Sequence, residues 1–312
     1  MADEKWISGL RGDMPVAAAA KLALGRRLDV VRNRLPAAVF EAESDIENVH
    51  QLRVGTRRAG AALRIFAELL PPGLYDKTRK SLRRLRRSAG AARDWDVFLA
   101  DLSARLGKAQ LKQRDGLVFL LGFARSQRDL AQESLRKAHD DAAEKFHKHS
   151  DAVAEHLGPS TDLPGTLRDL AGTMLSDLVR ELETAAGAEL QSYEALHRVR
   201  ILGKQLRYAM EIFESCFARP FRDTYYPAVE EMQEILGLAN DSHTACIRLE
   251  ALAARVQSAH PRQWPRCKPG FDLLLDFHRR RLPLQRRKFE RWWRAWLKSG
   301  AERAFVELIQ GA

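Results

Sequence analysis

Two stretches of this 312-residue sequence repeat one another at a distance of 147 residues. Residues 49–66 read VHQLRVGTRRAGAALRIF, and residues 196–213 read LHRVRILGKQLRYAMEIF. The same offset places GAARD at 90–94 onto GLAND at 237–241, without a gap between the two matches. A unit of this length is far longer than the repeats of solenoid proteins. The sequence therefore predicts a duplicated domain whose two halves follow one plan.

Almost the whole sequence has the residue pattern of α-helices, because no stretch alternates between apolar and polar residues as a half-buried strand does. In the first half we predict helices at 14–40, 44–70, 74–89, 95–106 and 111–157. In the second half, which restarts near 166, we predict helices at 192–217, 221–237, 241–257 and 271–300. Glycine and proline at 158–165 mark the linker. The expected fold is all-α, with one helical bundle at 10–158 and a second at 166–312.

The composition points to an anionic partner. The sequence has 52 lysines and arginines against 41 aspartates and glutamates, so its net charge is +11. Nucleic acid, an anionic membrane surface and polyphosphate all fit this charge, as does a basic surface without a ligand. Three cysteines without a CxxC motif favour free thiols in a reducing compartment. The acidic N-terminus is unlike a secretory signal, and the apolar run near 116–124 is too short to span a bilayer. We therefore expect a cytoplasmic protein without a transmembrane segment.

The repeated segment has an apolar seam that is typical of helical bundles. On a helix, six residues of each copy follow one another at steps of 3, 4, 3, 4 and 3, which places them on one face. In the first copy they are Val49, Leu52, Thr56, Ala59, Leu63 and Phe66. In the second copy they are Leu196, Val199, Gly203, Leu206, Met210 and Phe213. We expect both seams to face the core.

Beside each seam lies a strip of basic residues, and apolar residues lie on the far side of that strip. Like charges a few ångströms apart repel by about 1 kcal/mol per pair in water, so carboxylates or bound anions must offset them. Few carboxylates lie at matching steps, and Glu211 is an exception. We favour an anion-binding groove over a salt-bridged interface between the halves or a solvated surface. The strip consists of His50, Arg53, Arg57 and Arg64 in copy one, and His197, Arg200, Lys204 and Arg207 in copy two.

Further basic residues lie in the run 80–87, whose counterparts at 227–234 are mostly acidic. Arg83 and Arg87 share a helix face, so they either extend a phosphate track or pair with the acidic counterpart. Asp94 and Asp241 are predicted helix N-caps, with orientation of an arginine or histidine as the alternative. His50 and His197 either contact phosphate or have a structural role.

Catalytic and metal-binding motifs are not found in the sequence. It contains neither a P-loop nor an HExxH motif, and its serine, histidine and acidic residues lack motif context. His139, His147 and His149 lack a suitably spaced further ligand, so we interpret them as surface residues. The aromatic run at 291–296 either stacks on bases or packs in the core, and the spacing of Trp292 and Trp296 favours packing. We expect no enzyme activity, no cofactor and no metal.

Four motifs in this order resemble the CHAD family, named for a conserved histidine α-helical domain. They read HQLRVGTRRAGAALRIF, LRRLRRSAGAARDWDVF, HRVRILGKQLRYAMEIF and LGLANDSH, and together they cover both halves. The resemblance implies two four-helix bundles with pseudo-two-fold symmetry around a basic groove that binds inorganic polyphosphate. It also implies that the residues lining this groove include His50, Arg53, Arg57, His197, Arg200, Lys204 and Arg207. Gly60 and Gln205 stand where the family motifs often have basic residues, so the groove is expected to be asymmetric.

From the sequence we therefore expect a protein that binds inorganic polyphosphate. Polyphosphate or storage granules are a further expected partner. The expected binding residues are His50, Arg53, Arg57, Arg64, Arg83, Arg87, His197, Arg200, Lys204 and Arg207. The alternatives are an RNA- or single-stranded-DNA-binding protein and a helical scaffold without a polyanion ligand. Nucleic acid is the weaker candidate, because the repeated strip contains Tyr208 as its one aromatic residue.

Overall fold

The computed structural model describes residues 5–157 and 164–311, and in these ranges every regular element is a helix. The prediction of an all-α fold is confirmed. The linker predicted at 158–165 lies mostly outside the described residues. The α-helices are α1 (Val16–Phe40), α2 (Glu47–Ile65), α3 (Pro72–Leu106), α4 (Leu111–His156), α5 (Leu167–Gly187), α6 (Tyr193–Phe213), α7 (Tyr226–Ala259), α8 (Trp264–Lys298) and α9 (Ala301–Gln310).

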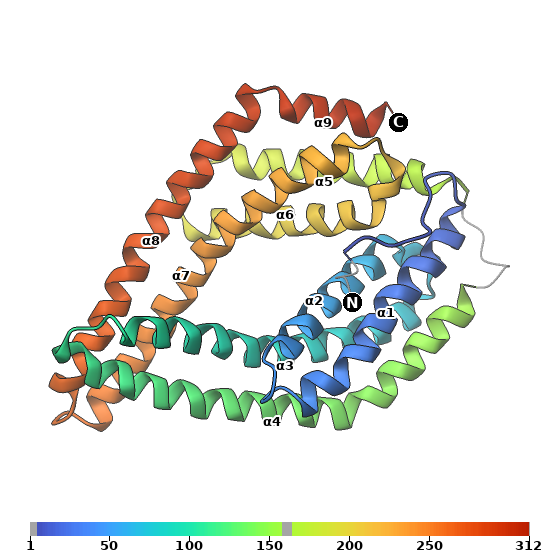
Figure 1. Ribbon diagram of the computed structural model, residues 1–312. Helices are drawn as coiled ribbons and strands as arrows, with labels where there is room; N and C mark the ends of the chain where they lie inside the picture. The colour runs from blue at the N-terminus through green and yellow to red at the C-terminus, as the bar shows by residue number, and fades with distance from the viewer. Residues whose placement is uncertain (1–4, 158–163, 312) are drawn as a thin grey trace.

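The helices pack as neighbouring pairs that follow the same order in both halves. The pairs α1–α2 and α3–α4 belong to the first half, and α5–α6 and α7–α8 belong to the second. Figure 1 shows these pairs as the sides of a frame, with α9 lying along α5. The halves meet where α4 packs on α8 and where α2 packs on α6. This common order is compatible with an internal duplication.

The apolar seams of α2 and α6 face the core as predicted. In α2 the seam residues from Val49 to Phe66 are at most 1% exposed, including the polar Thr56. In α6 the seam from Leu196 to Phe213 is buried in the same way. Because both seams are buried, the basic strips beside them are held at the edge of the core, where α2 and α6 approach each other.

The prediction of two separate helices at 74–89 and 95–106 is wrong, because α3 continues through Gly90 to Leu106. The same correction applies to α7, which continues through Gly237. A glycine inside a helix costs about 1 kcal/mol relative to alanine, and burial of the surrounding apolar face outweighs this cost. Asp94 and Asp241 therefore lie inside helices, and the interpretation of both as N-caps is wrong.

At the α4–α8 joint the two helix backbones touch. A Cβ atom on Gly116 of α4 would lie 2.0 Å from the carbonyl oxygen of Cys267. A Cβ on Gly270 of α8 would lie 2.7 Å from the backbone of Gly116. Both positions therefore require glycine for this close approach. In the described ranges, no helix is long and apolar enough to cross a membrane.

Candidate functional site

Two neighbouring cavities open between α2, α3, α6, α7 and α8. One has a volume of about 610 Å³ and the other a volume of about 500 Å³. We call the combined space the basic groove, because the wall that both cavities share is mostly basic. This shared wall consists of Arg53, Arg57, Asp94, Arg200 and Lys204.

The structure brings nine of the ten residues expected at the site to the basic groove. Arg53, Arg57, Arg200 and Lys204 form the shared wall, and Arg64, Arg87 and His197 line the larger cavity. His50 and Arg207 line the smaller cavity, whereas Arg83 lines neither. Sequence analysis missed further cations of the groove. They are Arg86, Arg93, Arg248 and Arg281, of which Arg93 lies in the repeated 90–94 motif.

Most cations of the basic groove have no acidic partner among the residues that the structure describes. Arg53 is an exception, since its Nη1 lies 2.6 Å from Asp94 Oδ1. This contact fits the alternative role of Asp94, in which it orients an arginine. Arg207 Nη1 lies 3.8 Å from Glu230 Oε1 at the edge of the groove. In the described part of the chain, no carboxylate lies within 4.0 Å of Arg57, Arg200 or Lys204. The same is true of Arg64, Arg86 and Arg87.

Lys204 experiences this excess of positive charge most strongly. Burial lowers the pKa of its ammonium to about 6, and the neighbouring Arg57, Arg200, Arg53 and Arg207 act in the same direction. Burial likewise lowers the pKa of Arg57 and of Arg200. Desolvation and like charges both disfavour the charged forms, and a bound anion removes the second effect. The geometry therefore favours an anionic ligand.

The pKa of both strip histidines is lowered from its ordinary value. Burial and the charge of Arg93 lower the pKa of His50, and burial and Arg200 lower the pKa of His197. The Tyr193 hydroxyl donates to Asn240 Oδ1 at 2.9 Å, so it accepts from His197 Nδ1 at 3.2 Å. This leaves His197 Nε2 as the acceptor nitrogen of the neutral ring.

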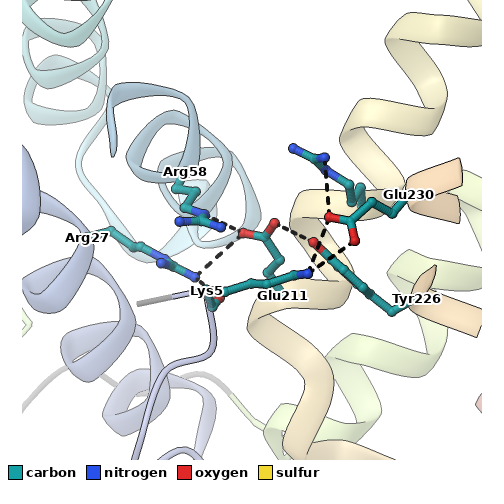
Figure 2. Close-up of polar contacts among 7 residues, drawn as sticks. Lys5, Arg27, Arg58, Glu211, Tyr226 and Glu230 are labelled. Atoms are coloured by element: carbon teal, nitrogen blue, oxygen red, sulfur yellow. Dashed lines mark hydrogen bonds and ion pairs between the residues drawn. The ribbon is translucent and has the colours of Figure 1, made fainter. Parts of the chain in front are cut away.

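Beside the groove, helices α1, α2, α6 and α7 hold a second group of charges, which are paired with one another (Figure 2). The Glu211 carboxylate of α6 accepts a hydrogen bond from Arg58 Nε of α2 at 2.7 Å and from the Tyr226 hydroxyl at 2.9 Å. Arg27 Nη2 of α1 lies 3.9 Å away, and both arginines are at most 9% exposed. We call Arg27, Arg58, Glu211 and Tyr226 the Glu211 cluster. It joins the two halves.

The N-terminal segment is attached to this cluster. The backbone oxygen of Lys5 accepts a hydrogen bond from Arg27 Nη2 at 2.8 Å, and Lys5 Nζ lies 3.3 Å from Glu230 (Figure 2). Glu230 thus contacts Lys5 on one side and Arg207 of the basic groove on the other. The groove and the Glu211 cluster therefore meet at this carboxylate. The salt-bridged interface that the sequence left open exists further along α6, where Glu211 follows Arg207 by four residues on the same helix face.

Other candidate sites have structural explanations. Within the described residues, no three His, Cys, Asp or Glu side chains are grouped to hold a metal ion. Trp293 is 8% exposed, and Trp292 stacks on Trp296 at 5.5 Å while its Nε1 donates to Glu231. The tryptophans are therefore packed inward, as their spacing favours. Arg84, between Arg83 and Arg87, pairs with Asp141 of the neighbouring helix α4.

Comparison with known proteins identifies the family. The CHAD domain model matches residues 22–250, so the chain belongs to the CHAD domain family. The crystal structure of the CHAD domain from the plant Ricinus communis is similar, with a TM-score of 0.71 and 25% identity over 90% of this chain and 96% of that one. PptA from Streptomyces chartreusis has the same fold, with a TM-score of 0.60 and 20% identity over 90% and 99% of the two chains. No curated protein matches the sequence.

Proposed function

We propose that this protein binds inorganic polyphosphate in the basic groove and is a binding module without catalytic activity. The observation that carries the proposal is the unpaired state of Arg57, Arg200 and Lys204, which converge from α2 and α6. The CHAD family is associated in general with the binding of polyphosphate or triphosphate. Both the family and the charge distribution therefore support the same class of ligand.

The chemistry of binding is electrostatic. Each arginine presents a planar fork that donates two parallel hydrogen bonds to phosphate oxygens. A hydrogen bond to a charged group contributes about 1.5–3 kcal/mol, from which the ordering of the polymer and side chains is subtracted. Burial and, after it, the neighbouring arginines lower the pKa of Lys204, and the phosphate charge offsets the effect of the arginines.

A polymer fits the site better than a single phosphate. The two cavities share a wall, so neighbouring phosphates of one chain have cations available in both. Contacts made by one molecule at several points add avidity. We attribute this arrangement to duplication of one bundle, with the repeats at 10–158 and 166–312. Long-chain polyphosphate should therefore bind much more tightly than orthophosphate.

Single-stranded nucleic acid remains the alternative ligand, and the aromatic side chains argue against it. Binders of single strands stack bases on exposed aromatic rings. Tyr208 and Phe98 line the basic groove, but they are only 5% and 6% exposed. The groove therefore offers cations for phosphates and little exposed ring surface for bases.

Charge reversal in the strips tests the proposal. Arg53→Glu with Arg57→Glu, and Arg200→Glu with Lys204→Glu, should each weaken long-chain polyphosphate binding at least about a hundredfold, since each loses two charged contacts. Calorimetry measures affinity and circular dichroism checks helicity. Folded strip variants that bind like the control would refute the proposed site. The matched control on α4, whose residues are exposed and outside the groove, is Lys112→Glu with Arg125→Glu.

Competition distinguishes the two ligands. Long-chain polyphosphate should displace labelled single-stranded DNA from the parent protein, whereas the DNA should not displace labelled polyphosphate at equal phosphate concentration. The reverse order of displacement would favour the nucleic-acid alternative. Polyphosphate should also raise the melting temperature, and less so in high salt, because salt already screens the repulsion.

A further inference from the structure

The outward face of α8 carries a second row of basic residues, distinct from the basic groove. They follow one another at steps of 7, 4, 3 and 4, which places them on one side of the helix. All are exposed. We call this row the outer stripe of α8, and it consists of Arg280, Arg287, Arg291, Arg294 and Lys298. At about 1.5 Å per residue, the stripe is about 27 Å long.

The outer stripe has no acidic partners among the described residues. No carboxylate lies within 4.0 Å of any of its five cations, or of the adjacent Lys288. Glu290, the acidic residue in this part of α8, lies 3.8 Å from Arg286 instead. Arg294 Nε donates to the backbone oxygen of Glu290, which holds that side chain along the helix. The stripe is therefore an exposed array of like charges available to a polyanion.

The opposite face of α8 decides which polyanion fits. Phe289 and Trp293 are buried, and Trp292 stacks on Trp296. The stripe thus presents guanidinium and ammonium groups without an exposed aromatic ring, so bases of a single strand find no stacking platform. The half-exposed apolar residues beside the stripe are Leu284 and Leu297. Two such side chains are too few to insert into a lipid surface. A ligand that consists of phosphates alone matches this surface best.

The outer stripe is continuous with the basic groove. Arg281 lines the smaller cavity of the groove, and Lys288 lies two turns further along α8 on nearly the same side. Lys288 in turn lines a hollow of about 490 Å³ together with Arg287, Arg291 and Arg294, and Glu290 is the acidic residue in this lining. Cations therefore lead from the groove to the outer face, and among the described residues no carboxylate lies within 4.0 Å of Lys288 or Arg291.

We propose that the outer stripe of α8 is a second binding surface for the same polyphosphate polymer, used by chains long enough to leave the groove past Arg281. The proposal rests on the function proposed above. The groove holds the first segment of the chain, and the stripe holds the segment that emerges. The stripe lies beyond residues 22–250, which the family model matches. Affinity should accordingly depend on chain length.

The test is the triple variant Arg287→Gln, Arg291→Gln and Arg294→Gln, which keeps side chains compatible with a helix. Calorimetry with tripolyphosphate and with long-chain polyphosphate gives both affinities, and thermal melting checks folding. We expect the stripe variant to bind tripolyphosphate like the parent. It should bind long-chain polyphosphate about tenfold more weakly, since three phosphate contacts are lost. The matched control neutralises three exposed cations of α4, as Lys112→Gln, Arg125→Gln and Lys145→Gln.

The dependence on salt gives a second measurement. For the long chain, the slope of log affinity against log salt should fall by about 2, because each contact with a single-stranded polymer contributes roughly 0.7. Equal long-chain affinity of the stripe variant and the α4 control would overturn the proposal. So would a selective loss of binding to single-stranded DNA or to phosphatidylserine vesicles. If the parent protein binds neither tripolyphosphate nor long-chain polyphosphate, the proposed function itself is wrong.

Discussion

Arg57 and Arg58 are neighbours on α2, yet they have opposite environments. Arg57 faces the basic groove, where no carboxylate of the described residues lies within 4.0 Å, and burial lowers its pKa. Arg58 faces the other way and donates to the buried carboxylate of Glu211 at 2.7 Å. Two adjacent residues of α2 thus contribute to two regions of the molecule. In the Glu211 cluster the charges are paired, and in the basic groove most cations lack a carboxylate partner among the described residues.

The two arginines represent two kinds of charge: paired charges that stabilise the fold, and cations that are available to a ligand. A buried ion pair is costly to break, because the remaining partner is left charged and desolvated. A half-buried cation without a partner is already in that unfavourable state, so its removal relieves the fold. Neutralising a charge in the Glu211 cluster should therefore lower the free energy of unfolding. Neutralising a cation of the basic groove should leave it unchanged or raise it.

The largest expected effect is at the Glu211 cluster. Glu211→Gln removes the buried charge that accepts from Arg58 Nε and from the Tyr226 hydroxyl, and should lower the free energy of unfolding by about 3–5 kcal/mol. Arg57→Gln is the control from the groove and should leave the stability unchanged or raise it. Urea denaturation followed by circular dichroism measures both. Equal destabilisation by the two substitutions would remove the distinction between the regions.

A smaller effect concerns pH and Lys204. The unfolded lysine holds its proton up to its ordinary pKa of 10.5, whereas in the empty groove the pKa is about 6. Without ligand, the unfolded chain binds more protons between these values, so this lysine makes stability rise with pH there. A bound phosphate favours the charged form of Lys204 and so raises its pKa again. Binding should then take up a proton, and affinity should fall from pH 6 to 8 by at most about tenfold per unit.

Calorimetry in buffers of different ionisation enthalpy measures this proton uptake. Above about pH 7, the three groove histidines His50, His197 and His278 contribute little, since their pKa values are lowered. Lys204→Arg keeps the positive charge and should abolish the uptake at that pH. Proton uptake that persists in Lys204→Arg would assign it to another group and leave Lys204 as one cation among several.

The smallest expected effect is at Glu230, where the two regions meet. Glu230→Gln removes the carboxylate 3.8 Å from Arg207, so affinity for polyphosphate should rise about two- to fivefold, as expected for a partly exposed ion pair. Glu231→Gln changes the net charge equally, but Glu231 contacts Trp292 instead. The same gain in both variants would show that net charge alone, and not Arg207, determines the effect.

The sequence predicted the local features of the site and missed those that depend on distant contacts. The buried seams and the basic strips followed from helical spacing within one segment. Arg58 could not be assigned in this way, because its partner Glu211 lies 153 residues away. Arg248 and Arg281 reach the groove from α7 and α8, which no pattern in α2 or α6 indicates. The continuity of α3 through Gly90 was missed because glycine was taken as a break.

The two joints of the frame also determine when the groove comes into existence. The Glu211 cluster joins residues 153 positions apart, and the Gly116–Gly270 crossing joins α4 to α8. During synthesis the first half emerges and folds before the second. Until α6 has been made, Arg53 and Arg57 have no opposing Arg200 and Lys204. In the proposed function, the nascent chain therefore lacks half of the binding wall until the second half has docked.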